Sequence, residues 1–184
     1  MIETARLRLR PLEAGDLGFL TGLMGDPRVM QHFGRVFTAE DSRAWLDRQR
    51  ARYDTVGYGY WLATERDTGR PVGQAGVLST PVADRPPEPA LGYILARDVW
   101  GRGYATEAAE ACCDWAFRTL RPARVITLIR PENVPSVRVA ERLRLRRQTH
   151  VMFGGYEHIL FSRARADHVP SASFALPASQ RPAG

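Results

Sequence analysis

The segment Trp100 to Thr106 reads Trp-Gly-Arg-Gly-Tyr-Ala-Thr and joins a glycine-rich turn to the start of an apolar helical pattern. A helix start leaves backbone N–H groups without partners, and the helix dipole favours an anion there. Gly101 and Gly103 can adopt left-handed conformations and keep side chains away from these donors. Arg102, between them, could add positive charge. The segment therefore predicts a site for a pyrophosphate.

Glycine geometry alone is the competing explanation for this turn. A tight strand-to-helix connection also needs glycine, and the turn by itself does not separate that need from phosphate binding. Other phosphate motifs are disfavoured, because neither the G-x-x-x-x-G-K-[ST] pattern of a P-loop nor a G-x-G-x-x-G after an early strand occurs.

The elements that must position this turn follow from the spacing of apolar residues. A buried strand, 91–95, precedes the turn, and residues 104–118 have the helical spacing that would follow it. Before them we expect a strand (6–10), three helices (13–24, 27–31 and one opened by Thr38), strands (59–64 and 71–78) and a loop (79–89). After them we expect a strand (125–129), a helix (135–143) and two strands (147–153 and 156–163). This order predicts a mixed α/β fold around a single sheet.

Length and composition bound the class of protein. The 184 residues favour one domain, and 44% hydrophobic with 25% charged residues is ordinary for a globular chain. We expect this domain to cover residues 1–166, and the Ala-, Ser- and Pro-rich residues 167–184 to form a disordered tail. No apolar run has the length of a membrane span and the N-terminus is not a signal peptide, so we expect no membrane partner and a cytoplasmic location.

The net charge of +6 has three explanations: nucleic acid, a polyphosphate cofactor, or a composition biased toward arginine. Nucleic acid is disfavoured, because the chain lacks aromatic stacking motifs and a recognition-helix pattern. The adjacent Cys112 and Cys113 give no zinc spacing, so we expect no metal and interpret both as packing residues.

The glycine turn and its surroundings resemble the acetyl-CoA motif of the GNAT superfamily of N-acetyltransferases. Residues 100–108 carry the match, and residues 91–95 resemble the strand before the motif. Residues 133–141, Asn-Val-Pro-Ser-Val-Arg-Val-Ala-Glu, are similar to the Asn-x-x-Ser helix start of the ribosomal-protein N-terminal acetyltransferase branch. Gly73 and residues 4–10 also fit, so the resemblance covers residues 2–165.

Three positions depart from the family pattern. Trp100 stands where the superfamily usually has Gln or Arg, a variation common in this branch. Arg144 stands where the branch has the glycine of Leu-Gly-Phe. Ala90 stands where the branch often has Glu, and alternation along a strand places Glu88 on the same face.

The resemblance implies a GNAT fold, with one mixed, mostly antiparallel twisted sheet, helices on both faces, and splayed central strands that form an acetyl-CoA cleft. It implies that Ile94 and Leu95 pair with the pantetheine arm through their backbones, and that Asn133 and Ser136 lie near that arm and the thioester sulfur. The implied cofactor-binding set is completed by Trp100, Gly101, Arg102, Gly103, Tyr104, Ala105 and Thr106.

The implied reaction is direct attack of a primary amine on acetyl-CoA in a ternary complex. Ser136 is the candidate proton donor to the leaving thiolate, and Glu88 is the first candidate for the general base, with Glu157 and His158 behind it. An α-amine, with a pKa of about 8, needs only weak base assistance at neutral pH. A backbone N–H near Ile94 could polarise the thioester oxygen.

The acceptor is either a protein N-terminal α-amine or a small-molecule amine. We expect His32, Phe33, Tyr58 and Tyr60 to line its pocket, where few acidic residues fall. The alternative function is a non-catalytic acyl-CoA-binding regulator of the same fold. This alternative stays open because Ala90 stands where the branch often has Glu. Whether the chain forms a homodimer stays open.

Overall fold

The computed structural model describes residues 1–83 and 85–170. The strands are β1 (Ile2–Glu3), β2 (Leu7–Pro11), β3 (Tyr60–Glu65), β4 (Pro71–Val82), β5 (Arg85–Leu95), β6 (Arg124–Ile129), β7 (Arg146–Phe153) and β8 (Tyr156–Ala164). The helices are α1 (Leu17–Gly25), α2 (Ala39–Thr55), α3 (Tyr104–Thr119) and α4 (Val134–Arg142), with 3-10 turns at Ala14–Asp16, Arg97–Val99 and Arg165–Asp167. One open sheet holds these strands in the order β1-β2-β3-β4-β5-β6-β8-β7. All neighbours are antiparallel except β5 and β6, which confirms the predicted mixed, mostly antiparallel fold.

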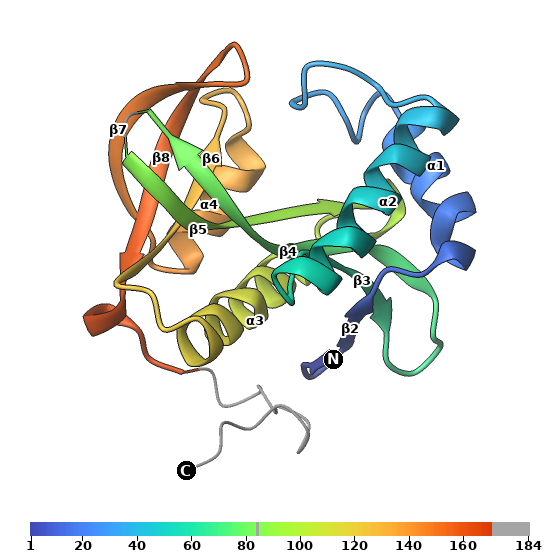
Figure 1. Cartoon of the computed structure of the whole chain (residues 1–184), viewed down its shortest axis with the longest axis horizontal. Coiled ribbons are helices and arrows are strands. Elements are labelled where there is room, and N and C mark those ends of the chain that lie inside the picture. The colour runs from blue at the N-terminus through green and yellow to red at the C-terminus, as the bar shows by residue number, and fades with distance from the viewer. Residues whose placement is uncertain (84, 171–184) are drawn as a thin grey trace.

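Helices cover both faces of the sheet, and successive residues of a strand pack on opposite faces. Trp61 and Ala63 of β3 pack with α3, whereas Tyr60 and Leu62 pack with α1 and α2. In Figure 1, α1 and α2 lie on the right, β6, β7, β8 and α4 lie on the left, and α3 lies below them. The buried Cys112 and Cys113 are free thiols on α3, in the packing role that the sequence predicts.

The two central strands part almost as soon as they meet. Ala90 and Ile126 are the pair that joins β5 to β6. One residue further on, the Thr127 hydroxyl donates to the Leu91 carbonyl oxygen at 3.0 Å, where a regular ladder would have a backbone donor. Beyond this point the strands diverge, which gives the splay that the family resemblance implies.

The predicted loop at residues 79–89 is wrong, because β4 and β5 continue through most of it as a long hairpin. The prolines suggested a loop, but their positions are compatible with the ladder. Ala96 N–H donates to Val72 of β4, so by alternation the even-numbered residues of β5 bond to β4. Pro87 and Pro89 are odd-numbered and remove no donor from that ladder, and the even-numbered Pro86 lies where the register shifts between Thr80 and Val82.

Two further expectations differ from the structure. Residues 27–31 form turns rather than a short helix, with Met30 N–H donating to the Asp26 carbonyl. The predicted tail begins at residue 167, yet His168 is only 6% exposed and stacks on Phe117 of α3. The folded part thus extends to His168, and residues 171–184 of the predicted tail lie outside the described residues.

Helix α4 ends in a turn that normally uses glycine. Arg144 has φ 55°, in the left-handed region, and Leu145 N–H donates to the Ala140 carbonyl across it. This is the Schellman arrangement, in which glycine avoids the cost of a side chain at that φ. The family's Leu-Gly-Phe turn is therefore retained here with an arginine in the glycine position.

We expect Arg144→Gly to stabilise the fold. Relief of the left-handed strain outweighs the extra freedom of glycine in the unfolded chain, for a net gain of about 0.5–1 kcal/mol. Thermal unfolding should shift upward by about 1–4 °C. Arg144→Ala is the matched control, because it removes the side chain beyond Cβ and keeps the strain; an equal gain with alanine would contradict this explanation.

Candidate active site

The glycine turn has the conformation that an anion cradle requires. Gly101 has φ 77° and Gly103 has φ 81°, and Gly103 is the N-cap of α3. The first intrahelical bond runs from Glu107 N–H to the Gly103 carbonyl, so the N–H groups of the preceding turn are not used within the helix. A pyrophosphate fits this donor set and the positive end of the α3 dipole.

Thr4 and Arg6, near the N-terminus, hold this turn in place through hydrogen bonds, an arrangement that the sequence alone did not reveal. Arg6 donates to both carboxylate oxygens of Glu107, through its backbone N–H and its side chain, at 2.7 Å each. Its guanidinium also donates to the Arg102 carbonyl at 2.8 Å and stacks on the Tyr104 ring. Burial would raise the pKa of Glu107, but hydrogen bonds from Thr4 and Arg6 lower it, so this carboxylate stays ionised and holds the turn.

A second ion-pair network stabilises the turn through Tyr104 and Asp98. Tyr104 donates its hydroxyl to Glu65 at 3.1 Å, and Glu65 is bound by Arg70. Arg70 also binds Asp98, directly before the turn, at 2.6 Å. These partners lie far apart in the sequence, so local motifs could not have identified them.

Backbone groups for a pantetheine arm come from the odd-numbered residues of β5. The backbone N–H and C=O groups of Ala96 and Ile94 face β4, because alternate residues of a strand bond to the same neighbour. The backbone groups of Leu91, Tyr93 and Leu95 therefore face the splay. The predicted pairing through Ile94 is therefore not supported, and Tyr93 takes its place. Trp100, 46% exposed, donates its indole N–H to the Leu95 carbonyl at 3.0 Å, so the Leu95 N–H is the group left on this side.

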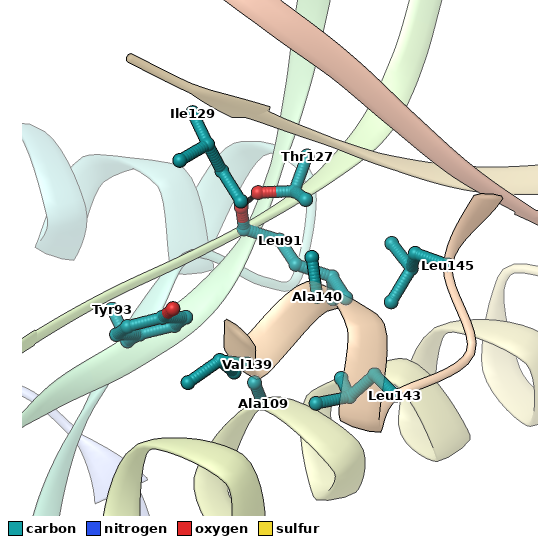
Figure 2. Close-up of a pocket in the computed structure, with 9 residues that line it drawn as sticks. All are labelled: Leu91, Tyr93, Ala109, Thr127, Ile129, Val139, Ala140, Leu143 and Leu145. Carbon is teal, nitrogen blue, oxygen red and sulfur yellow. Dashed lines mark hydrogen bonds between the residues drawn. The ribbon is translucent and has the colours of Figure 1, made fainter. Parts of the chain in front are cut away.

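The base of the splay is closed by side chains from β5, β6, α3 and α4 (Figure 2). A narrow space of about 10 Å³ lies there, lined by Leu91, Tyr93, Ala109, Thr127, Ile129, Val139, Ala140, Leu143 and Leu145. This is roughly room for one water molecule. A ligand must therefore enter beyond Thr127, where the strands separate.

Tyr93 brings a hydroxyl to this place, and the sequence interpretation missed it. Burial raises the pKa of Tyr93 to about 12, and the neighbouring Ser136 side chain partly offsets that rise. Among the described residues, the Tyr93 hydroxyl oxygen has no well-formed hydrogen bond. Two hydroxyl groups, one from β5 and one from the first turn of α4, therefore lie together at the splay.

Asn133 is the N-cap of α4. Its side-chain oxygen accepts from the Ser136 N–H at 3.2 Å, which fixes the helix start that carries Ser136. Capping uses the oxygen, and the amide nitrogen of the same side chain is a further donor. The capping role is shown, and the predicted contact with the cofactor stays a prediction.

Tyr60 reaches the splay from the face of α1 and α2. A Cβ on Gly92 would lie 1.8 Å from the Tyr60 hydroxyl, and one on Gly76 would lie 2.4 Å from its Cα, so Tyr60 depends on two glycines. Its ring also meets Trp45 edge-on, with ring centroids 5.2 Å apart. Tyr58, predicted to line the same pocket, packs on Trp115 of α3 at the opposite face. Tyr58 precedes β3, which begins at Tyr60, so the period of the strand does not hold the two tyrosines on one face.

His32 and Phe33 lie on the loop between α1 and α2. Burial is the main cause that lowers the pKa of His32, and the charges of Arg130 and Glu132 also act on it. His32 therefore lies near the end of β6, and Phe33 beside it is 47% exposed. Their loop joins α1 and α2, which pack on the Tyr60 side of the sheet, and the lining of an acceptor pocket by these two residues stays a prediction.

Glu88 lies at the far end of β5 from the splay and already has a partner. Arg124 binds both of its carboxylate oxygens, one of them at 2.6 Å, and this hydrogen bonding lowers the pKa of Glu88. A carboxylate held ionised by an arginine is a poor proton acceptor. The other candidates also have partners: the exposed Glu157 pairs with His150, and the ring of the half-buried His158 bonds to the Tyr156 carbonyl. None of the three has the environment of a general base.

We expect Glu88→Gln to leave turnover within about twofold of wild type and to cost about 1 kcal/mol of stability, the magnitude of a partly exposed ion pair. Because the folded-state pKa is depressed, the pair stabilises fully above the ordinary glutamate pKa and is lost as the pH falls below it. Steady-state rates and urea unfolding check both effects. A loss of more than about 100-fold in kcat with an intact fold would restore Glu88 as the base.

No helix of the described residues is long and apolar enough to cross a membrane. Among the same residues, no group of three or more His, Cys, Asp or Glu side chains is arranged to hold a metal ion.

Comparison with known proteins identifies the family of the chain. The sequence profile of the acetyltransferase (GNAT) domain matches residues 6–146. An uncharacterized protein of Bacillus subtilis, YkkB, is 35% identical over 143 residues, which are 77% of this chain and 83% of that protein. The uncharacterized N-acetyltransferase YnaD of the same species is 28% identical over 148 residues, 80% of this chain and 83% of that one. The crystal structure of an acetyltransferase from Agrobacterium tumefaciens, 30% identical, superposes with a TM-score of 0.76 over 87% of this chain and 91% of that one.

The chain belongs to the GNAT family of acetyltransferases. It is an enzyme that transfers the acetyl group of acetyl-CoA to a primary amine. The left-handed glycines, the N-terminus of α3 and the splay beyond Thr127 are the features of this structure that fit that donor.

Proposed function

We propose that this enzyme carries out the transfer at the splay between β5 and β6, with the acceptor amine arriving from the side of Tyr60, His32 and Phe33. The observation that carries this proposal is the meeting of two hydroxyl groups, from Tyr93 and Ser136, where the strands part. The glycine turn holds the pyrophosphate, and the backbone of Tyr93 and Leu95 guides the arm from there to the splay. Asn133 adds its amide nitrogen.

Ser136 and Tyr93 stabilise the thiolate that leaves. At neutral pH the Tyr93 hydroxyl stays protonated, so it is a hydrogen-bond donor. A thiol with a pKa of about 8.5 is a weak base once ionised, so its thiolate needs donors more than full proton transfer. The acceptor needs no strong base if its amine is an α-amine with a pKa of about 8, because part of it is neutral at pH 7. Placing the two reactants together supplies much of the remaining rate.

The test is release of free CoA over a panel of amines, with Ser136→Ala, Tyr93→Phe and the double variant. Each single variant should lower kcat about 10- to 100-fold, and the double should lose less than the product of the two, because both hydroxyls serve one sulfur. Ser79→Ala, on the exposed side of β4, is the matched control. Unchanged turnover in the double variant would contradict the assignment, and CoA binding without turnover on any amine would favour an acyl-CoA-binding regulator. A cytoplasmic location remains a prediction from the sequence, and whether the chain forms a homodimer stays open.

A further inference from the structure

Three segments that are distant in the sequence meet at the end of β6, on the acceptor side of the splay. They are the loop at His32 and Phe33, the turn at Arg130 and Glu132, and Tyr156 at the start of β8; we call these five residues the mouth. The Arg130 guanidinium lies 4.3 Å from the centroid of the Tyr156 ring, and a Cβ on Gly34 would lie 2.8 Å from that ring. Ile129, the residue before Arg130, lines the same space as Tyr93.

Arg130 is held in one orientation with a donor to spare. Its face stacks on Tyr156, and one terminal nitrogen binds Glu132 at 2.6 Å. The side chain is 20% exposed, and its Nε is buried without a hydrogen-bond partner among the described residues. Buried donors are nearly always paired, so a guanidinium fixed in this way is suited to a planar acceptor brought by a ligand.

Beside the Arg130–Glu132 ion pair, the mouth presents aromatic side chains. Phe33 and Tyr156 are exposed, and Val36 and Phe153 beside them are exposed as well. Three carboxylates on or next to these segments have partners: Glu132 pairs with Arg130, Glu157 with His150, and Asp41, in the first turn of α2, with Arg35. A polycation such as a polyamine or an aminoglycoside needs unpaired carboxylates, and the mouth offers an arginine instead.

We propose that the acceptor is an apolar α-amino acid, whose carboxylate binds Arg130 and whose side chain packs on Phe33 and Tyr156 while its amine points to the splay. The inference rests on the acetyl transfer proposed above. Bidentate binding of a carboxylate by arginine fixes distance and direction together, so Arg130 determines which amines reach the reactive position.

The test compares kcat/KM for leucine, leucinamide, a short peptide that begins with leucine, and spermidine. Wild type should favour leucine over each of the others by at least about 10-fold. In Arg130→Gln, KM for leucine should rise at least about 10-fold, with kcat, KM for acetyl-CoA and the rate with leucinamide near wild type. Arg130→Lys, which keeps the charge and loses the fork, should lie between, and Arg43→Gln, at an exposed arginine of α2, should match wild type.

Two outcomes overturn this inference and leave the enzyme activity standing: a preference for leucinamide, the peptide or spermidine, or an equal loss on leucine and leucinamide in Arg130→Gln. Failure to release CoA with every amine would instead contradict the proposed function. If Arg130→Gln does not fold, Arg130→Lys gives the same comparison, because a uniform drop across acceptors in that variant also overturns the role of Arg130.

Discussion

Gly92→Ala should be among the most damaging single-atom changes in this enzyme. Its Cβ would lie 1.8 Å from the Tyr60 hydroxyl and 2.9 Å from the ring carbon that bears it, so Tyr60 must move. Overpacking of this kind costs about 1–3 kcal/mol, and a misplacement near the reacting groups can cost about 100-fold in rate. We expect kcat/KM for the acceptor to fall by about 100-fold, measured beside thermal unfolding.

Tyr60→Phe is the partner variant for this test, because it removes the atom that collides first. In the Gly92→Ala background it should recover part of both the stability and the rate, since the two changes share one contact. Gly22→Ala is the control, at a helical position where a Cβ meets nothing within 4 Å. A strictly additive double variant would show that Gly92 is required for a reason other than Tyr60.

Gly103→Ala should weaken CoA binding about 10- to 100-fold. Gly103 has φ 81°, so a side chain there is strained in the left-handed region, although its Cβ would make only an ordinary contact, at 3.4 Å, with the Arg6 guanidinium that holds the turn. The turn must then relax, and its N–H donors no longer converge on the pyrophosphate. Isothermal titration with CoA measures the effect.

Gly69→Ala is the matched control for that change. Gly69 has φ 70° and open space at its Cβ, in the turn between β3 and β4. Both variants should lose about 1–2 kcal/mol of stability from strain, but only Gly103→Ala should lose affinity. Equal Kd values for the two variants would mean that the turn is needed for geometry alone, the explanation that the sequence left open.

The parts of the site that sequence predicts well are those built from neighbours in the chain. The turn at Gly101 and Gly103, the α3 start at Tyr104, and the cap of α4 at Asn133 each follow from local backbone rules. The same rules failed at Pro87 and Pro89, because whether a proline interrupts a strand depends on which side its nitrogen faces. That orientation is set by the register with β4.

The parts that sequence did not predict depend on pairing across the sheet. Register directs Tyr93 rather than Ile94 to the splay. Tyr58 precedes β3 and packs on the opposite face from Tyr60, which the sequence spacing of two residues did not predict. Arg6 with Glu107, and Arg124 with Glu88, join residues from different elements. Glu88 lies on the strand face that the sequence suggested for a general base. Its position far along β5 from the splay and its ion pair with Arg124 make it a poor proton acceptor.

The most direct test of the central claim is a titration of the isotope-labelled full chain with CoA, followed by backbone amide NMR. We predict that the largest shifts fall on residues 102–106 and on Tyr93 and Leu95, with smaller shifts at Ile94, whose N–H faces β4. Strong shifts confined to another part of the molecule, for example around Trp61 and Trp115 on the α3 face, would contradict the assignment of the glycine turn and the splay as the acetyl-CoA site.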